Sequence, residues 1–231
     1  MQFFDPSILQ SGQYHDWLVR GFILSLQLTA ASFVFALPFG AVVALMRTSG
    51  FKPLRGLGAS IVEGIRNVPL LAHLLFWYFA FPELLPEGAR EFLYANNPEA
   101  VCAVIALSLY SGVHMAEDIR SGIRAVPPSQ LEAARSLGLG RFASVRLVLL
   151  PQAFRAATPP LLSQTVNLWK DTSVATVIGA AELMYQAARV ETASFRSLEA
   201  FTFATLAYLG VSLLISFAAY LFQRRYPVRP A

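Results

Sequence analysis

The amino-acid sequence predicts an all-α protein that crosses a membrane several times. The chain of 231 residues is 55% hydrophobic and only 14% charged, whereas soluble domains carry about 25% charged residues. Charges are also absent from two long intervals, between Arg20 and Arg47 and between Glu199 and Arg224. Each interval exceeds the roughly 20 apolar residues that a membrane-spanning helix needs. The alternative, a soluble protein with buried core helices, rarely contains two such runs.

Five spans are expected in order along the chain. The first and the last coincide with the two uncharged intervals, and the three between them contain ionisable residues, among them Glu63, His114 and Lys170. A charge at membrane depth costs at least about 3 kcal/mol on insertion scales, so these side chains are expected to face protein or water. Residues 1–231 show no internal repeat and are expected to form a single transmembrane domain. The spans are expected at about residues 20–46, 60–82, 99–120, 160–184 and 199–223.

The distribution of lysine and arginine predicts the orientation of the chain. Twelve of these residues fall in the loops after the first and third spans and in the tail after the fifth, while only four fall on the opposite side. Because these residues accumulate in the cytoplasm, the N-terminus is expected outside and the C-terminus inside. The net charge of +4 is thus a signal of topology, since nucleic-acid binding would need a basic face with interleaved aromatic residues. The twelve are Arg47, Lys52, Arg55, Arg120, Arg124, Arg135, Arg141, Arg146, Arg155, Arg224, Arg225 and Arg229.

No sequence pattern is typical of an enzyme or of a cofactor site. A P-loop requires a Gly-Lys dipeptide, and neither Lys52 nor Lys170 follows a glycine. The three histidines and the single cysteine, Cys102, lack the spacing of a metal site, and no Gly-x-Ser-x-Gly elbow occurs. The N-terminus lacks the basic region of a cleavable signal peptide, so the first span is expected to be an uncleaved anchor.

The polar loop between the third and fourth spans, about residues 124–156, is expected to begin with a short helix. Ser129 and Glu132 fit the S-x-x-E capping box, in which each side chain bonds the backbone amide of the other residue. Pro127 and Pro128 stop any helix upstream. The short helix is therefore expected to start after Ser129 and to end at Gly138, which fits a C-terminal glycine.

A helix of about two turns is marginal alone in water and needs a surface to pack on. Ala133 and Ala134 are small enough to allow close approach of a partner. A second amphipathic piece follows at 141–150, and Pro151 is expected to end it. We therefore expect the loop to dock on another polypeptide. The alternative is a helix that lies on the membrane surface without a partner.

Four segments of the chain together form a family pattern. The loop reads Glu132-Ala133-Ala134, then Gly138, then Leu149-Leu150-Pro151. Before it stand GIRNVPLL and AEDIRSGIRAVPPSQLEAA, and after it stands NLWKDTSVATVIGAAEL. In this order and spacing the segments, over roughly 63–183, resemble the permease subunits of bacterial ATP-binding-cassette importers, in the polar amino-acid branch with its EAA loop. The sequence departs from that pattern at Val68, His73, Ser121 and Ser129.

The resemblance implies a fold, an assembly and a location. It implies the type I importer permease fold, in which one chain forms half of the translocation path and a second, identical or related permease chain forms the other half. ATPase subunits would bind ATP and magnesium and receive the EAA loop, so no cofactor is expected in this chain. An extracytoplasmic binding protein would deliver a polar amino acid, and the bacterial inner membrane is the implied location. ATP-driven closure of the ATPases would then expose a midplane site alternately to the two sides.

Polar side chains in the interrupted spans are the candidates for the substrate path. An amino acid presents a carboxylate, which Arg matches bidentately, and an ammonium group, which Asp or Glu matches. At membrane depth such groups are tolerated where they face a cavity. Arg66 with Glu63 and Lys170 with Asp171 are alternatively interpreted as structural ion pairs. Glu182 is interpreted as a packing or interface residue near the outer side. The candidates are Arg66, Asn67, Glu117, Lys170, Asp171 and Thr172.

The predicted function is thus the permease subunit of an importer for polar amino acids. Within transport, the alternative is the same machinery for another small polar solute, such as an opine or an amine. From another class, the alternative is a passive channel or a membrane scaffold that works without an ATPase.

Overall fold

The computed structural model describes residues 10–226, and these residues form helices joined by short turns, with no β-strand. Helices α1 (Gln13–Thr48), α5 (Pro98–Arg124) and α10 (Ser197–Arg225) are long and apolar enough to cross a membrane. They contain the first, third and fifth expected spans, and the all-α class is confirmed. The other elements are α2 (Lys52–Arg66), α3 (Leu70–Leu75), η2 (Phe76–Ala80), η3 (Phe81–Leu84), α4 (Glu87–Ala95), α6 (Pro128–Ser136), α7 (Arg141–Ser144), η4 (Val145–Leu149), α8 (Leu150–Asp171), η5 (Thr172–Ile178) and α9 (Leu183–Ser194).

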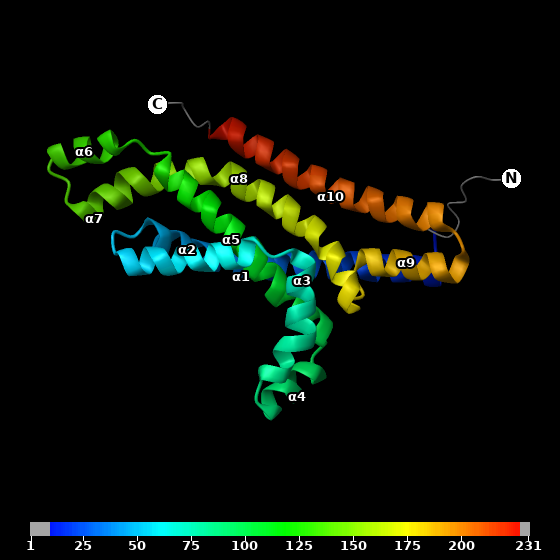
Figure 1. Ribbon diagram of the computed structural model, residues 1–231. Coiled ribbons are helices and arrows are strands. Elements are labelled where there is room, and N and C mark those ends of the chain that lie inside the picture. The colour runs from blue at the N-terminus through cyan, green and yellow to red at the C-terminus, as the bar shows by residue number, and fades with distance from the viewer. Residues whose placement is uncertain (1–9, 227–231) are drawn as a thin grey trace.

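The helices lie in an elongated bundle (Figure 1), in which α1 contacts α5, α5 contacts α8, and α8 contacts α10. Helices α6 and α7 lie at one end of the bundle and α9 at the other, while α3 and α4 project from its middle as an arm. Helix α1 starts at the end where α9 lies, and α10 runs from that end toward the side of α6 and α7. Along α10 the apolar side chains are largely exposed, including Leu206, Leu214 and Phe217. Such a surface is expected to face lipid or another chain.

The second expected span, 60–82, is broken rather than continuous. Helix α2 ends with Asn67 as its C-cap, and α3 begins only after Pro69. Proline explains the break, because it disfavours the helical conformation of the residue before it, Val68. The Nε2 atom of His73 lies 3.0 Å from the carbonyl oxygen of Ile65 and so bridges the two pieces.

The fourth expected span, 160–184, is interrupted as well. Helix α8 ends at Asp171, and the chain tightens into the 3-10 segment η5. Gly179 then turns the chain with a φ of +83°, a left-handed conformation that favours glycine, before α9 begins. The two spans that carry Arg66 and Lys170 are therefore irregular beside these candidates, whereas Glu117 lies in the continuous helix α5. Irregular backbone at membrane depth is tolerated where it is buried in protein or lines a cavity.

The expectation that Pro151 ends a helix is wrong. Pro151 is the second residue of α8, and the π-helical turn η4 joins α7 to α8 in one continuous path. In that turn the amide of Leu150 donates to the carbonyl of Val145, five residues back. The wider turn relieves the clash between a proline ring and the carbonyl four residues earlier. A second π-helical turn, η2, lies in the same position before Pro82.

A seam of small residues joins α1 to α5. Ser32, Ala36 and Gly40 recur at every fourth position of α1 and are buried. The hydroxyl of Ser108 on α5 donates to the carbonyl of Ser32 at 3.3 Å, and a Cβ at Gly40 would lie 2.6 Å from the carbonyl oxygen of Gly112. Small residues with this spacing let two helix backbones approach closely, which is how helices associate in a membrane.

The substitution Gly40→Ala is expected to destabilise the protein, because its Cβ would meet a backbone atom of α5 that cannot rotate away. Overpacking of this kind costs about 1–3 kcal/mol, so the midpoint of thermal unfolding in detergent should fall. Gly210→Ala on α10 is the matched control, since nothing lies within 4 Å of the added Cβ. Equal midpoints for the two variants would contradict the close approach of α1 and α5.

Candidate functional site

The expected loop at 124–156 runs from the last residue of α5 into the first two turns of α8, and it is called the coupling loop below. Its helix α6 starts at Pro128, earlier than expected, because the fixed φ of proline suits the first position of a helix. Ser129 therefore lies inside the helix, and the N-cap residue is Pro127, with no capping bond from a side chain. The predicted capping box of Ser129 and Glu132 is wrong.

The predicted end of this helix at Gly138 is confirmed. Gly138 has a φ of +86°, its amide donates to the carbonyl of Arg135 at 2.9 Å, and the amide of Leu139 donates to the carbonyl of Ala134 at 3.1 Å. These two bonds form a Schellman motif, which satisfies the last carbonyls of a helix. The turn from α6 to α7 therefore has a fixed geometry.

The two alanines of the coupling loop face different ways. Ala134 is only 4% exposed and packs inside the protein, whereas Ala133 and Glu132 are exposed. In the described part of the chain, the carboxylate of Glu132 makes no hydrogen bond and no ion pair. Ala133 is thus at the surface, while Ala134 allows the loop to pack on its own chain.

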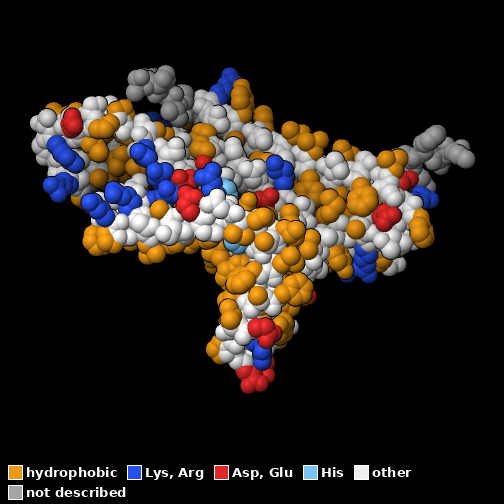
Figure 2. All heavy atoms as spheres, in the orientation of Figure 1, with side chains coloured by type: hydrophobic (Ala, Val, Ile, Leu, Met, Phe, Trp, Pro, Cys, Tyr) orange, Lys and Arg blue, Asp and Glu red, His pale blue; other side chains and the backbone are white. Residues whose placement is uncertain are grey.

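Apolar side chains flank the turn between α6 and α7. Leu137 is 84% exposed and Phe142 is 77% exposed. Exposed apolar side chains that lie together on a polar loop are typical of a surface that another molecule covers. Figure 2 shows Lys and Arg side chains gathered at and near this end of the molecule. The loop thus presents an apolar tip in a basic surrounding.

Glu117, a substrate-path candidate, lies between two arginines. Its Oε1 atom is 2.7 Å from Nη1 of Arg47, at the end of α1, and its Oε2 atom is 2.9 Å from Nη1 of Arg120. All three side chains are mostly buried. Both carboxylate oxygens are therefore already paired, and the geometry favours a role in holding α1 to α5.

The substitution Glu117→Gln is expected to lower the free energy of unfolding by about 1–3 kcal/mol, because charge-assisted contacts of this kind are worth about 1.5–3 kcal/mol each. Glu83→Gln is the matched control. Glu83 pairs with Arg90 at 3.4 Å on the exposed arm, and exposed pairs contribute about 0–1 kcal/mol. Thermal unfolding in detergent measures both variants, and equal midpoints would contradict a structural role for Glu117.

The two candidates at the break after α2 are both exposed. The side-chain amide of Asn67 donates to the carbonyl oxygen of Glu63 at 2.9 Å and to its Oε2 atom at 3.0 Å. Glu63 is thus bonded to Asn67, and within residues 10–226 the structure shows no ion pair between Arg66 and Glu63. Arg66 is left exposed at the end of α2.

The three candidates at the end of α8 have different surroundings. Lys170 is exposed, Asp171 is half-buried, and Thr172 is fully buried. The hydroxyl of Thr172 donates to the carbonyl of Trp169 at 2.8 Å and so belongs to the interior in this conformation. Lys170 and Asp171 form no ion pair in the described structure. Asp171 is thus a carboxylate at a helix break with no cation paired to it.

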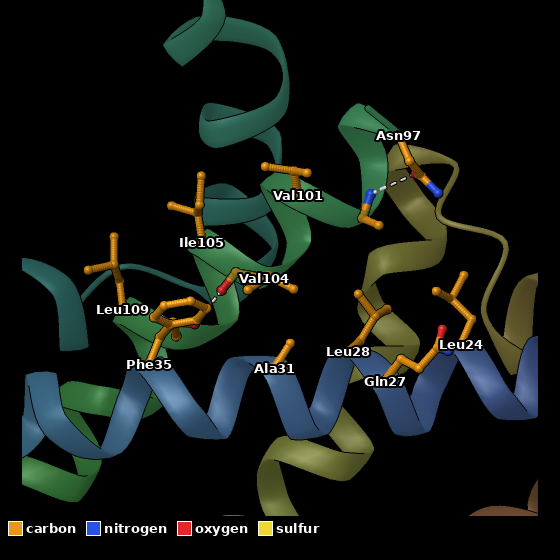
Figure 3. Close-up of a pocket in the computed structure, with 12 residues that line it drawn as sticks. Leu24, Gln27, Leu28, Ala31, Phe35, Asn97, Val101, Val104, Ile105 and Leu109 are labelled. Carbon is orange, nitrogen blue, oxygen red and sulfur yellow. Dashed lines mark hydrogen bonds between the residues drawn. The ribbon is translucent and has the colours of Figure 1, made fainter. Parts of the chain in front are cut away.

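The structure brings the two interrupted spans together. Leu70 and Leu74 of α3 share one buried cluster with Ala175 and Ile178 of η5. The polar candidates directly precede these packed segments in each span. In contrast, a cavity of about 700 Å³ at the angle between α1 and α5 is lined by apolar side chains such as Phe35 and includes none of the candidates (Figure 3).

Comparison with known proteins shows the family to which the chain belongs. Residues 36–227 match the family described as binding-protein-dependent transport system inner membrane component. Glutamate/aspartate import permease protein GltJ of Escherichia coli (strain K12) is 32% identical over 216 residues, which are 92% of this chain and 88% of that protein. Nopaline transport system permease protein NocQ of Agrobacterium fabrum (strain C58) is 36% identical over 194 residues, 80% of each protein.

A solved structure described as an amino acid ABC transporter with histidines superposes on this chain with a TM-score of 0.83 at 33% identity, and covers 97% of this chain and 100% of the other. Both the sequence match and the superposition extend over most of the chain, including the coupling loop and the two interrupted spans. The chain belongs to the family of binding-protein-dependent transport system inner membrane components and has the type I ABC importer permease fold.

Proposed function

We propose that this chain forms half of the translocation path of an ATP-driven importer for polar amino acids. The observation that carries the proposal is the coupling loop, where a fixed turn stands between the exposed Leu137 and Phe142, and the helix before that turn carries the exposed Glu132. A rigid exposed tip of this kind can transmit the movement of an ATPase to α5 and α8, between which it lies. The chain itself has no P-loop, so hydrolysis belongs to the partner.

The proposed assembly contains three further kinds of protein. ATPase subunits hold ATP and magnesium beneath the coupling loop, and a second permease chain, identical or related, covers part of the exposed apolar surface of this one. An extracytoplasmic binding protein delivers the substrate at the end of the bundle where α9 lies. The N-terminus faces this outer side and the C-terminus the cytoplasm, in agreement with the excess of Lys and Arg at the opposite end.

An opine is the second candidate substrate, because a nopaline permease subunit is among the relatives. An opine keeps the carboxylate and amine of an amino acid and adds a second acidic arm, so the same polar residues could meet it. Uptake of radiolabelled glutamate, glutamine, arginine and nopaline by the reconstituted complex discriminates the two substrate classes.

Co-purification tests the proposed assembly. The tagged chain is extracted in a mild detergent from its native membrane, and the proteins that accompany it are identified by mass spectrometry. We expect a P-loop ATPase, and a second permease chain if the pore is a heterodimer. A chain that elutes alone, from an extract without associated ATPase activity, would favour the passive channel.

A further inference from the structure

Glu182 is a fully buried carboxylate between η5 and α9. Burying an ionised carboxylate costs several kcal/mol unless hydrogen bonds or a cation compensate for lost water. No ion pair involves Glu182 in the described part of the chain. The compensation must therefore come from hydrogen bonds, and their donors show what this residue holds together.

The two oxygens of Glu182 have different partners. Oε1 accepts from the hydroxyl of Thr176 on η5 at 2.5 Å and from the amide of Tyr185 in the first turn of α9 at 2.8 Å. Oε2 accepts from the hydroxyl of Tyr208 on α10 at 2.6 Å and from the hydroxyl of Ser25 on α1 at 3.2 Å. Oε1 thus fixes the local turn, while Oε2 attaches that turn to two other helices.

Neighbouring contacts strengthen this attachment. The hydroxyl of Ser25 also accepts from the amide of Leu183 at 3.0 Å, and a Cβ at Gly21 would lie 2.9 Å from the carbonyl oxygen of Glu182, so α1 and the start of α9 are in backbone contact. On the other side of η5, near the end of α8, Nε1 of Trp169 donates to the carbonyl of Tyr208 at 3.0 Å. Tyr208 therefore ties the segments before and after η5 to α10.

Asp171 lies between these two attachments. It directly precedes η5, whose 3-10 hydrogen bonds are poorer than those of an α-helix. The position of its carboxylate thus depends on how firmly Trp169 and Thr176 are held. We propose that Glu182 is a positioning residue, which through Thr176 and Tyr208 holds η5, and with it Asp171, in place for substrate passage. This role rests on the proposed function as an importer.

Glu182→Gln isolates the contacts to the other helices. The amide of Tyr185 needs an acceptor, so the glutamine oxygen stays in the place of Oε1, and its NH₂ group takes the place of Oε2 beside Tyr208 and Ser25. The contacts to these two hydroxyls then lose the charge of the carboxylate, which makes such bonds about twice as strong as neutral ones. The complex is reconstituted with its ATPase and binding protein in proteoliposomes. We expect amino-acid uptake per ATP hydrolysed to fall by about fivefold, as for the loss of one such bond, while ATPase activity stays stimulated. Tyr208→Phe should also lower the ratio of uptake to ATP hydrolysis.

The ratio of uptake to hydrolysis does not depend on how much folded complex is present, so a loss of stability alone cannot change it. Tyr220→Phe is the matched control, because Tyr220 lies exposed on the same helix, α10, and its hydroxyl makes no hydrogen bond within the described residues. An unchanged ratio in Glu182→Gln, or a parallel fall of uptake and hydrolysis, would overturn the role of Glu182. If Glu182→Gln fails to assemble, Tyr208→Phe and Ser25→Ala are judged by the same ratio.

A wild-type complex without ATP-driven uptake would instead overturn the proposed function itself.

Discussion

Glu132→Lys in the coupling loop is expected to abolish most ATP-driven uptake while the permease still folds and inserts. The side chain is exposed, and its carboxylate makes no contact within the described residues, so the change removes no interaction inside the chain. At a docked surface, however, a reversed charge costs several kcal/mol. A loss of about 3 kcal/mol would weaken docking by about a hundredfold. Uptake in proteoliposomes and the amount of co-purified ATPase measure both effects.

Ser129→Ala is the control for this experiment. Ser129 is exposed on the same helix, and its side chain does not cap α6, so its loss is expected to change neither docking nor uptake. Full ATP-driven uptake by Glu132→Lys would refute docking through α6. Flux that persists in the variant without ATP would favour a passive channel.

The neighbouring alanines separate docking from folding of the loop. A tryptophan at Ala133 projects from an exposed position, whereas a tryptophan at Ala134 must enter a site that is 4% exposed. Both variants are expected to lose uptake. Only Ala134→Trp should also lower the unfolding midpoint, because overpacking a filled site strains the chain.

The features that the sequence predicts correctly depend on local rules. The two uncharged intervals predict α1 and α10 correctly, because the length and the hydrophobicity of a segment largely decide whether it can span a membrane. Gly138 follows the end of α6 because the backbone there takes a left-handed conformation, which glycine adopts without strain. In both cases no distant residue changes the outcome.

The features that the sequence misses arise where two rules compete or where contacts are distant. Ser129 is a good capping residue, but Pro128 can occupy the first position of the helix and moves the start upstream. Pro151 is a helix breaker, yet a π-helical turn accommodates it. Glu182 receives donors from α1 and α10, which hydropathy cannot reveal, because serine and tyrosine leave those spans uncharged. In the structure Glu182 serves as the N-cap of α9, a local role that does not reveal the contacts to α1 and α10.

Asp171→Asn is expected to reduce uptake by at least about tenfold without lowering the unfolding midpoint. If Asp171 formed a structural pair with Lys170, its loss would destabilise the protein, but the described structure shows no such ion pair. If it instead meets the ammonium group of an amino acid, its loss removes a charge-assisted hydrogen bond worth about 1.5–3 kcal/mol, or a factor of at least about ten in affinity. Uptake and thermal unfolding are measured on the same preparation.

Glu117→Gln, measured in the same way, is expected to lower the unfolding midpoint, whereas Asp171→Asn is not. Both variants replace a carboxylate by its amide at a substrate-path candidate. Glu117 is held by Arg47 and Arg120, whereas Asp171 has no ion pair within residues 10–226. Neutralising a structural carboxylate lowers the stability of the protein. Neutralising a carboxylate that contacts substrate instead lowers transport and leaves the stability unchanged. A lower midpoint with normal uptake in Asp171→Asn would therefore place it with Glu117 among the residues that hold the bundle together. The path would then have to be sought at the exposed Arg66 and Asn67, on the other interrupted span.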